Sequence, residues 1–486
     1  MMSTVGGGLV LDENLLFEQS QPGRVGYSLP DLDVPEALPQ GEYLRDEIAG
    51  FPELSEVDVV RHYTRLSTWN YGVDTGFYPL GSCTMKYNPK VNEAAARLPG
   101  FTDIHPQSPE ALNQGALELM YNLQHDLGEV SGFPAITLQP AAGAQGEFTG
   151  MLMIRAWHEA NGQKRNKVII PDTAHGTNPA SAALCGYEVV TVASDGVLSK
   201  EAVAAVMDDD VAALMVTNPN TLGLFESDIR AICDLVHERG GLVYSDGANL
   251  NAMMGMSRPG DIGVDVMHFN LHKTFSTPHG GGGPGSGPVG IVEKLRPFLP
   301  TPFVVKDGDT FKLEYDCPQS IGRMKAFYGH FGILVRAYSY LLSMGGEGLK
   351  RATELAVLNA NYIRARLEGV YDLPNKRRSL HEVVFSEDAL ANDCHTLDVA
   401  KRLIDYGYHP PTIYFPLVVH GALMIEPTET ESKQVLDEFC DALLVIAEEA
   451  KNDPQLLKKA PVRAKVKRLD EATAARKPKL RWEEAE

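Results

Sequence analysis

Short, uninterrupted apolar runs alternate with amphipathic stretches between about residues 100 and 340. Such runs are typical of strands buried on both faces of a sheet, and the amphipathic stretches are typical of helices that cover it. The predicted strands are 168–171, 188–192, 212–217, 241–244 and 265–270, and the predicted helices are 112–130 and 229–239. Because strands and helices alternate, we expect an α/β fold with a mainly parallel sheet.

The two ends of the chain follow other patterns. The first 95 or so residues lack strong periodicity and include Pro30, Pro35 and Pro39, which indicates an extended arm that lies on a partner or on the main body. A break at Gly345 and Gly346 precedes a helix that leads into a smaller α+β domain. In that domain we expect a helix over 347–367, strands over 412–416 and 422–425, and a closing helix over 430–450 capped by Thr428 or Thr430.

These patterns predict three parts. They are an N-terminal arm over 1–95, a large domain over 96–345, and a small domain with a tail over 346–486. The last 25 or so residues mix Lys, Arg and Glu, which fits a solvated tail or an arm on a partner.

Composition narrows the class of protein. A chain of 486 residues is too long for one core, and 44% hydrophobic with 22% charged residues is ordinary for a soluble globular protein. A net charge of −20 disfavours nucleic acid as a partner. Six cysteines without C-x-x-C spacing predict neither a zinc site nor a disulfide framework. With no secretory signal and no apolar run near the roughly 18 residues that span a membrane, we expect a cytoplasmic protein.

Two residues at strand ends carry the main chemical signal. Asp246 follows the strand 241–244, and Lys273 follows the strand 265–270. In α/β enzymes the chemistry lies at the carboxyl ends of the strands. A lysine that forms a Schiff base, together with an aspartate that pairs with a pyridinium nitrogen, is what a pyridoxal phosphate (PLP) enzyme needs. We therefore predict that Lys273 is catalytic and that Asp246 binds the cofactor PLP.

Other strand-end loops supply further candidates for cofactor binding. Small residues before a helix, among them Gly143 and Ala144 with Gln145, indicate an anion cradle built from backbone N–H groups. The remaining predicted cofactor-binding residues are His175, which is placed to stack on the pyridine ring, His272, a phosphate donor, and Ala248 and Thr221 in neighbouring loops.

Two motif-like patterns are set aside. The run 285–290 fits G-x-G-x-x-G, but Pro288 opposes helix continuation and no acidic residue completes a dinucleotide unit. Lys273 and Thr274 resemble the end of a P-loop, but His272 occupies the glycine position. The chain also lacks H-E-x-x-H, so no metal site is predicted.

Several longer segments resemble the P-protein family of the glycine cleavage system, in particular subunit 2 of its two-subunit prokaryotic form. They are 78–89, the segment around Asp246, 271–289, 320–323, 327–329 and 425–432, and the likeness extends into the arm over 17–30. The chain departs from the family at Gln145, where many subunit-2 sequences carry histidine and the single-chain form carries glutamine.

The resemblance implies a fold-type-I PLP enzyme. It implies that PLP-dependent decarboxylation of glycine releases CO2 and leaves the aminomethyl group on the lipoyl group of the H-protein carrier. It also implies a homologous partner, subunit 1, in an α2β2 heterotetramer. Ser82, Cys83, Lys86 and Asn88 are then candidates for recognising the substrate carboxylate and the lipoyl group.

Three other functions remain open. An aminotransferase or a cysteine desulfurase shares the aspartate and the lysine. Arg323 is available for a transaminase carboxylate, and a desulfurase needs a mobile catalytic cysteine that the sequence does not place near Lys273. A non-catalytic scaffold is the third alternative, but a scaffold needs no aspartate, lysine and phosphate cradle together.

Overall fold

The computed structural model describes residues 13–483 apart from positions 40, 47, 49, 106–107 and 281–284. The chain divides into two compact units, Met1–Thr75 and Gly76–Glu486, which we call the N-terminal unit and the main unit.

The N-terminal unit has few regular elements. It contains η1 (Leu16–Gln19), η2 (Gly41–Tyr43) and α1 (Glu56–Ser67). Ser55 caps α1, since its hydroxyl accepts a hydrogen bond from the Asp58 backbone N–H. Among the residues described here, only Leu54 and His62 are buried. The unit therefore has almost no core of its own.

A sheet of seven strands forms the centre of the described part of the main unit. The strands are β1 (Ala135–Thr137), β2 (Lys167–Pro171), β3 (Glu188–Val192), β4 (Val211–Thr217), β5 (Leu242–Gly247), β6 (Val266–Phe269) and β7 (Val289–Ile291). Their spatial order is β1-β7-β6-β5-β4-β2-β3. Strands β2 to β6 pair in parallel, and β7 runs antiparallel to both β6 and β1. The predicted, mainly parallel sheet is confirmed, and β2 to β6 correspond to the five predicted strands.

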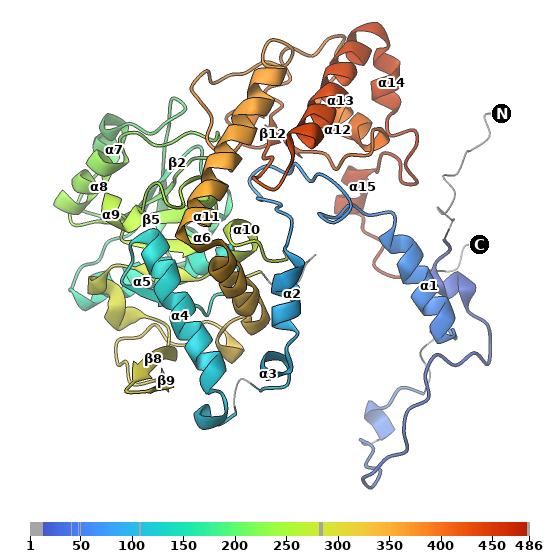
Figure 1. Ribbon diagram of the computed structural model, residues 1–486, viewed down its shortest axis with the longest axis horizontal. Coiled ribbons are helices and arrows are strands. Elements are labelled where there is room, and N and C mark those ends of the chain that lie inside the picture. The colour runs from blue at the N-terminus through green and yellow to red at the C-terminus, as the bar shows by residue number, and fades with distance from the viewer. Residues whose placement is uncertain are drawn as a thin grey trace. The chain divides into compact units, whose positions relative to one another are not determined.

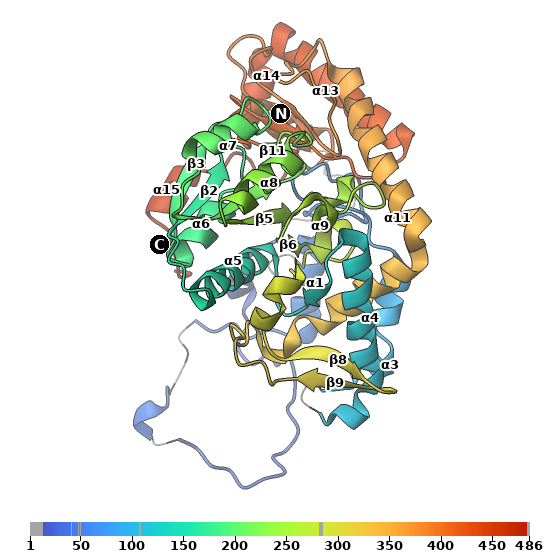
Figure 2. The ribbon, with the colours of Figure 1, turned by 90° about the vertical axis from the view of Figure 1, so that its left-hand side faces the viewer.

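Strands β2, β4, β5 and β6 of this sheet are buried on both faces, which explains their apolar runs in the sequence. Side chains alternate between the faces, so Val168 and Ile170 pack with α5 (Gly143–Ala160) and α6 (Thr177–Leu184), whereas Ile169 packs on the opposite side. That side is covered by α4 (Gln114–Ser131), α7 (Lys200–Val206) and α8 (Ile229–Glu238). Figure 2 shows α5 and α8 on opposite sides of β5.

A long helix, α11 (Phe331–Leu367), connects the sheet to the C-terminal elements (Figure 1). Its first half contributes Ile333 to the core of the sheet, and its second half contributes Ile363 to the C-terminal core. The break predicted at Gly345 is a non-helical residue inside this helix, with φ 59° and ψ −179°.

The C-terminal elements surround a three-stranded sheet in the order β10-β12-β11, described by β10 (Val383–Phe385), β11 (Thr412–Ile413) and β12 (Leu423–Ile425). Strands β11 and β12 were predicted, and β10 was not. Helices α12 (Thr396–Asp405) and α13 (Lys433–Asn452) pack on the same core. The predicted cap of α13 was wrong: the side chain of Ser432, not Thr428 or Thr430, accepts the Val435 N–H.

The remaining elements are short. They are α2 (Lys90–Ala96), α3 (Pro99–Thr102), η3 (Glu110–Leu112), η4 (Leu250–Ala252), α9 (Pro259–Ile262), α10 (Leu271–Thr274), η5 (Glu293–Phe298), β8 (Phe303–Asp307), β9 (Thr310–Glu314), η6 (Ala326–Tyr328), α14 (Pro454–Lys459) and α15 (Glu471–Arg476). No helix of the described residues is long and apolar enough to cross a bilayer.

Residues 76–95 belong to the main unit, although the sequence analysis assigned them to the arm. Phe77 packs edge to face on Phe439 of α13, with ring centroids 4.9 Å apart. The division into 1–95, 96–345 and 346–486 stays a prediction.

Helix α5 lies so close to the sheet that its glycines cannot be replaced freely. A Cβ atom on Gly150 would lie 2.6 Å from the ring of Tyr244 and 2.9 Å from Val266. We expect Gly150→Ala to lower the free energy of unfolding by about 1–3 kcal/mol, because the overlap forces α5 away from β5 and β6. Urea unfolding measures this. Gly115→Ala in α4, where nothing lies within 4 Å of the new Cβ, is the matched control and should not destabilise. Equal effects at both positions would contradict the prediction.

Candidate active site

A cavity of about 190 Å³ opens at the carboxyl ends of the parallel strands. This is where α/β folds bind ligands. Its lining contains most of the predicted site residues, namely Ser82, Gly143, Ala144, His175, Thr221, Asp246, Ala248, His272 and Lys273. It also contains residues that the sequence analysis did not select, namely Glu147, Thr177, Thr217, Asn249, His268 and Asn270.

Lys273 enters this cavity from α10, immediately after β6. Its Nζ donates a hydrogen bond to the backbone carbonyl oxygen of Ser82 at 2.8 Å. A carbonyl oxygen orients the amine and adds no charge. The amine therefore lies at the wall of the cavity in a fixed position.

Asp246 lies at the end of β5 and is only 4% exposed. Its Oδ1 accepts the Ala248 N–H at 2.9 Å, and its Oδ2 accepts from Asn178 Nδ2 at 3.1 Å. His268 Nε2 lies 3.4 Å from Oδ1. Burial opposes the charge on Asp246, but His268 and these two donors outweigh it, so the pKa of Asp246 is lowered and the carboxylate is ionised. Ala248 thus stabilises the Asp246 carboxylate through its backbone N–H and not through its side chain.

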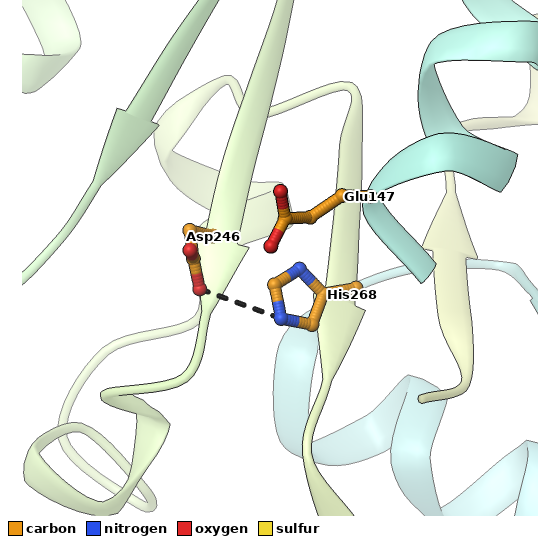
Figure 3. Close-up of side chains that lie close together, drawn as sticks. All are labelled: Glu147, Asp246 and His268. Carbon is orange, nitrogen blue, oxygen red and sulfur yellow. Dashed lines mark ion pairs between the residues drawn. The ribbon is translucent and has the colours of Figure 1, made fainter. Parts of the chain in front are cut away.

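Glu147 and His268 complete a buried cluster around Asp246 (Figure 3). Glu147 comes from α5, and its carboxylate points toward the space between the other two side chains. It accepts hydrogen bonds from Thr177 Oγ1 at 2.8 Å and Ser181 Oγ at 3.2 Å. Burial, and then the charge of Asp246, raise the pKa of Glu147 to about 7. One carboxyl of the cluster is therefore ionised and the other holds its proton up to near neutral pH.

Both missed residues left a signal in the sequence. Glu147 lies one helical turn after Gly143, so it shares the face of α5 that begins at the cradle. His268 pairs directly with Asp246 in the register of β5 and β6, so the two side chains share one face of the sheet. The helical spacing of four residues from Gly143 identifies Glu147, and the cross-strand pair of Asp246 identifies His268.

The predicted anion cradle is the start of α5. This 18-residue helix begins at Gly143, where a Cβ atom would lie 2.6 Å from Asn270 Oδ1. Its first turn presents backbone N–H groups and the positive end of the helix dipole. The side chain of Gln145 is used elsewhere: it accepts the Ala141 N–H at 2.6 Å and donates to the Met324 carbonyl at 2.8 Å. Gln145 therefore braces the loop and does not line the cavity.

The two predicted histidines occupy different walls. Nδ1 of His272 accepts the Ser286 N–H at 3.2 Å, and burial lowers the pKa of His272 to about 3, so its ring is neutral. His175 is exposed, and its ring packs edge to face on Phe415 at 5.5 Å. His175 thus forms the open side of the cavity.

Of the four residues predicted to recognise substrate, the cavity contains Ser82 but not Cys83, Lys86 or Asn88. Lys86 is 2% exposed, and its Nζ lies 2.7 Å from Glu429 Oε1 and donates to the Thr274 carbonyl at 2.8 Å. A lysine committed to a buried ion pair has no free charge for a substrate anion, so these contacts do not support the substrate role of Lys86, which stays a prediction.

The donor set fits PLP. It combines an amine that can condense with an aldehyde, an ionised buried carboxylate for a pyridinium nitrogen, and a helix N-terminus for a phosphate. Lys273 would hold the aldehyde carbon, Asp246 the ring nitrogen, and the first turn of α5 the phosphate.

The raised pKa of Glu147 predicts a pH-dependent contribution to stability. A carboxyl whose pKa rises from 4.5 to about 7 on folding stabilises the native state below 4.5, and this contribution is lost as the pH rises through 7. Relative to Glu147→Gln, the wild-type chain should therefore lose melting temperature progressively between pH 4.5 and 7. Thermal unfolding at several pH values checks this. The same change at the exposed Glu201 is the control, and parallel curves for wild type and Glu147→Gln would contradict the prediction.

Two family models match the main unit. One is described as glycine dehydrogenase, C-terminal domain, and matches residues 352–467; the other is aminotransferase class-V and matches residues 148–299. A crystal structure of glycine decarboxylase (P-protein) of the glycine cleavage system superimposes with a TM-score of 0.69 at 21% identity, covering 86% of this chain and 92% of that one. The fold-type-I prediction is confirmed.

Relatives resemble the chain over nearly its full length. A probable glycine dehydrogenase (decarboxylating) subunit 2 from Halalkalibacterium halodurans is 59% identical over 97% of this chain and 98% of its own. The protein of the same name from Caldanaerobacter subterraneus is 59% identical over 96% of this chain and 98% of its own. The chain therefore belongs to the family of glycine dehydrogenase (decarboxylating) subunit 2 proteins.

Proposed function

We propose that this chain is the PLP-carrying subunit of an enzyme that decarboxylates glycine and passes the aminomethyl group to the lipoyl group of the H-protein carrier. The observation that carries the proposal is one cavity lined by the Lys273 amine, the ionised Asp246 and the N-terminus of α5. The names of the full-length relatives supply the substrate, glycine.

Bound PLP supplies an electron sink that makes loss of CO2 from an amino acid feasible. The residues of the chain position it. Asp246 keeps a negative charge where the ring nitrogen would lie, and His268 and Asn178 hold that carboxylate in place. Lys273 provides the amine, which the Ser82 carbonyl orients.

The alternative functions receive less support from the site. Arg323, the candidate for a transaminase carboxylate, lies over the ring of Tyr328 and does not line the cavity. Cys83 follows Ser82 in the chain but does not line the cavity, and its thiol is near enough to Lys273 to feel the charge of that amine. However, burial raises the pKa of its thiol, which opposes the thiolate that a desulfurase needs. A scaffold does not require an ionised, buried aspartate.

Replacement of Lys273 tests the catalytic assignment. We expect Lys273→Ala to lose the visible absorption band with PLP and to lower exchange of labelled CO2 into glycine by at least about three orders of magnitude. Lys451→Ala, at an exposed position of α13, should leave both unchanged. Keto-acid formation in place of CO2 exchange would identify a transaminase and refute the decarboxylase proposal.

The N-terminal unit supports a partner, which we propose is subunit 1 of an α2β2 enzyme. The word subunit in the names of the relatives implies such a second chain. The unit exposes a series of large apolar side chains, namely Val25 (69%), Tyr27 (76%), Leu29 (83%), Leu32 (69%) and Leu38 (68%). Apolar side chains displayed in series are typical of a segment that is covered on assembly. We place the assembly in the cytoplasm, where the six cysteines stay reduced, as they are in this structure.

Substitutions in this unit test the partner. We expect Tyr27→Asp and Leu29→Asp each to weaken association with subunit 1 by at least about tenfold, because each places a charge at an apolar contact. Asp31→Asn on the same segment should have little effect. Co-purification and analytical ultracentrifugation measure this, and we expect the chain without its partner to bind PLP weakly or to be inactive. Full glycine turnover with the lipoyl carrier by the isolated chain would overturn the proposal.

A further inference from the structure

Two fully buried glutamates lie next to the Lys273 segment, and neither lines the cavity. Glu382 directly precedes β10 and Glu426 directly follows β12. Val383 and Ile425 pair across these antiparallel strands, so the two glutamates are neighbours at one end of the small sheet. One carboxylate oxygen of each glutamate and a ring nitrogen of His381 lie within 4.8 Å of one another.

The two carboxyls have unequal partners. Both oxygens of Glu426 accept hydrogen bonds from one residue: Thr84 N–H at 2.9 Å and Thr84 Oγ1 at 2.5 Å. Glu382 accepts only the Ser82 N–H, at 2.9 Å, and its Oε1, which lies 3.8 Å from His381 Nε2, accepts no hydrogen bond from the described residues. Two buried carboxyls this close do not both ionise, so Glu426, which has more hydrogen-bond donors, is the one that loses its proton first, and Glu382 keeps its proton.

The directions of the pKa shifts agree with this assignment. Burial raises the pKa of Glu426 to about 7, while the Thr84 donors and the nearby Lys273 and Lys86 lower it. Burial, followed by the charge of Glu426, raises the pKa of Glu382 well above its ordinary value. Burial also lowers the pKa of His381 to about 3, so its ring is neutral. The Cys83 thiol faces the same pair, and burial raises its pKa.

Residues 81–84, which these carboxyls contact, have a backbone conformation that is intrinsically unfavourable. Ser82 and Thr84 have φ values of 63° and 44°, in the left-handed region that costs about 1–2 kcal/mol for a residue with a side chain. Gly81 packs against Met424 of β12 so closely that a Cβ atom would lie 2.2 Å from its Cγ. Contacts from the small sheet therefore impose the conformation of residues 81–84.

The same segment reaches the reactive amine. The Ser82 N–H donates to Glu382, and the Ser82 carbonyl accepts from Lys273 Nζ at 2.8 Å. One peptide segment thus connects the buried carboxyl pair to the wall of the cavity.

We propose that Glu382 and Glu426 are positioning residues that hold residues 81–84 in place and thereby orient the Lys273 amine, with Glu426 the member of the pair that ionises and Glu382 the member that stays neutral. Their effect on the reaction rests on the proposed function, whereas their effect on the segment does not.

Amide hydrogen exchange in the chain without PLP tests the positioning. In Glu426→Gln, an amide group can replace only one of the two accepting oxygens, so exchange of the peptide over 81–84 should rise by about tenfold. Glu382→Gln should change it by less than about threefold, because one oxygen still accepts the Ser82 N–H and an NH2 group replaces the protonated oxygen. Glu387→Gln is the matched control, since Glu387 accepts a backbone N–H from Thr396 and not from this segment. Unchanged exchange in Glu426→Gln would overturn the proposal.

The pH dependence of the visible band distinguishes an effect of the Glu426 charge from an effect of its packing. In the assembly loaded with PLP, Glu426→Gln should move the pH midpoint of the visible band down by about half a unit, because it removes a negative charge near the lysine nitrogen. Glu382→Gln and Glu387→Gln should leave the midpoint in place. Equal shifts in Glu382→Gln and Glu426→Gln would overturn the charge assignment.

Two further outcomes are informative. If no band forms even in the wild-type assembly, the proposed function fails while the exchange result still decides the positioning. One equivalent of a metal ion per purified chain, lost in Glu382→Gln, would overturn the proposal, because His381, Glu382 and Glu426 would then be its ligands.

Discussion

The burial of one negative charge, on Asp246, is the constraint on which the rest of the site depends. Its carboxylate lies beneath the cavity with almost no contact with water, so the protein must supply the stabilisation that water would give. The stabilising groups come from α6, from the turn after β5 and from β6. Since these elements are far apart in the sequence, the ionised carboxylate exists only when the sheet has its native register.

Two pairs of carboxyls, one in the cavity and one next to it, must each be stabilised by hydrogen bonds from the protein in place of water. Glu147 beside Asp246, and Glu382 beside Glu426, are pairs of carboxyls too close for both to be charged. In each pair, unequal hydrogen bonding decides which member ionises. The site therefore has a defined pattern of charge, which suits a cofactor with a cationic ring, an amine that must lose its proton and an anionic phosphate.

The sequence predicted those parts of the fold that are determined by residues close together along the chain. Strands β2, β4, β5 and β6 are buried on both faces, so their apolar runs were visible without a partner strand. Asp246 and Lys273 were found because a charged residue within three positions of the end of such a run lies near the carboxyl end of a strand, where α/β folds bind their ligands. By contrast, β10 is only three residues long, and Ser432 rather than Thr428 caps α13 because Thr428 has φ 61° and belongs to the preceding turn.

The missed parts of the site depend on long-range pairing. Glu382 and Glu426 lie in separate segments that meet only through the antiparallel register of β10 and β12, and their partners Ser82 and Thr84 come from a third segment. Lys86 was assigned to a substrate for the same reason, since nothing near it in the sequence indicates the ion pair with Glu429. No short window of residues contains both sides of such a contact.

The kink in α11 has a consequence for which residues the chain tolerates at its surface. Nothing lies within 4 Å of a Cβ atom placed on Gly345, so by contacts alone any side chain fits there. Yet the combination of φ 59° and ψ −179° is open almost exclusively to glycine. A residue with a Cβ would straighten the helix and change the angle between the half that packs on the large sheet and the half that packs on the small one. An uncrowded surface position can therefore be as strictly fixed in identity as one in the interior, because the shape of the backbone alone selects the residue.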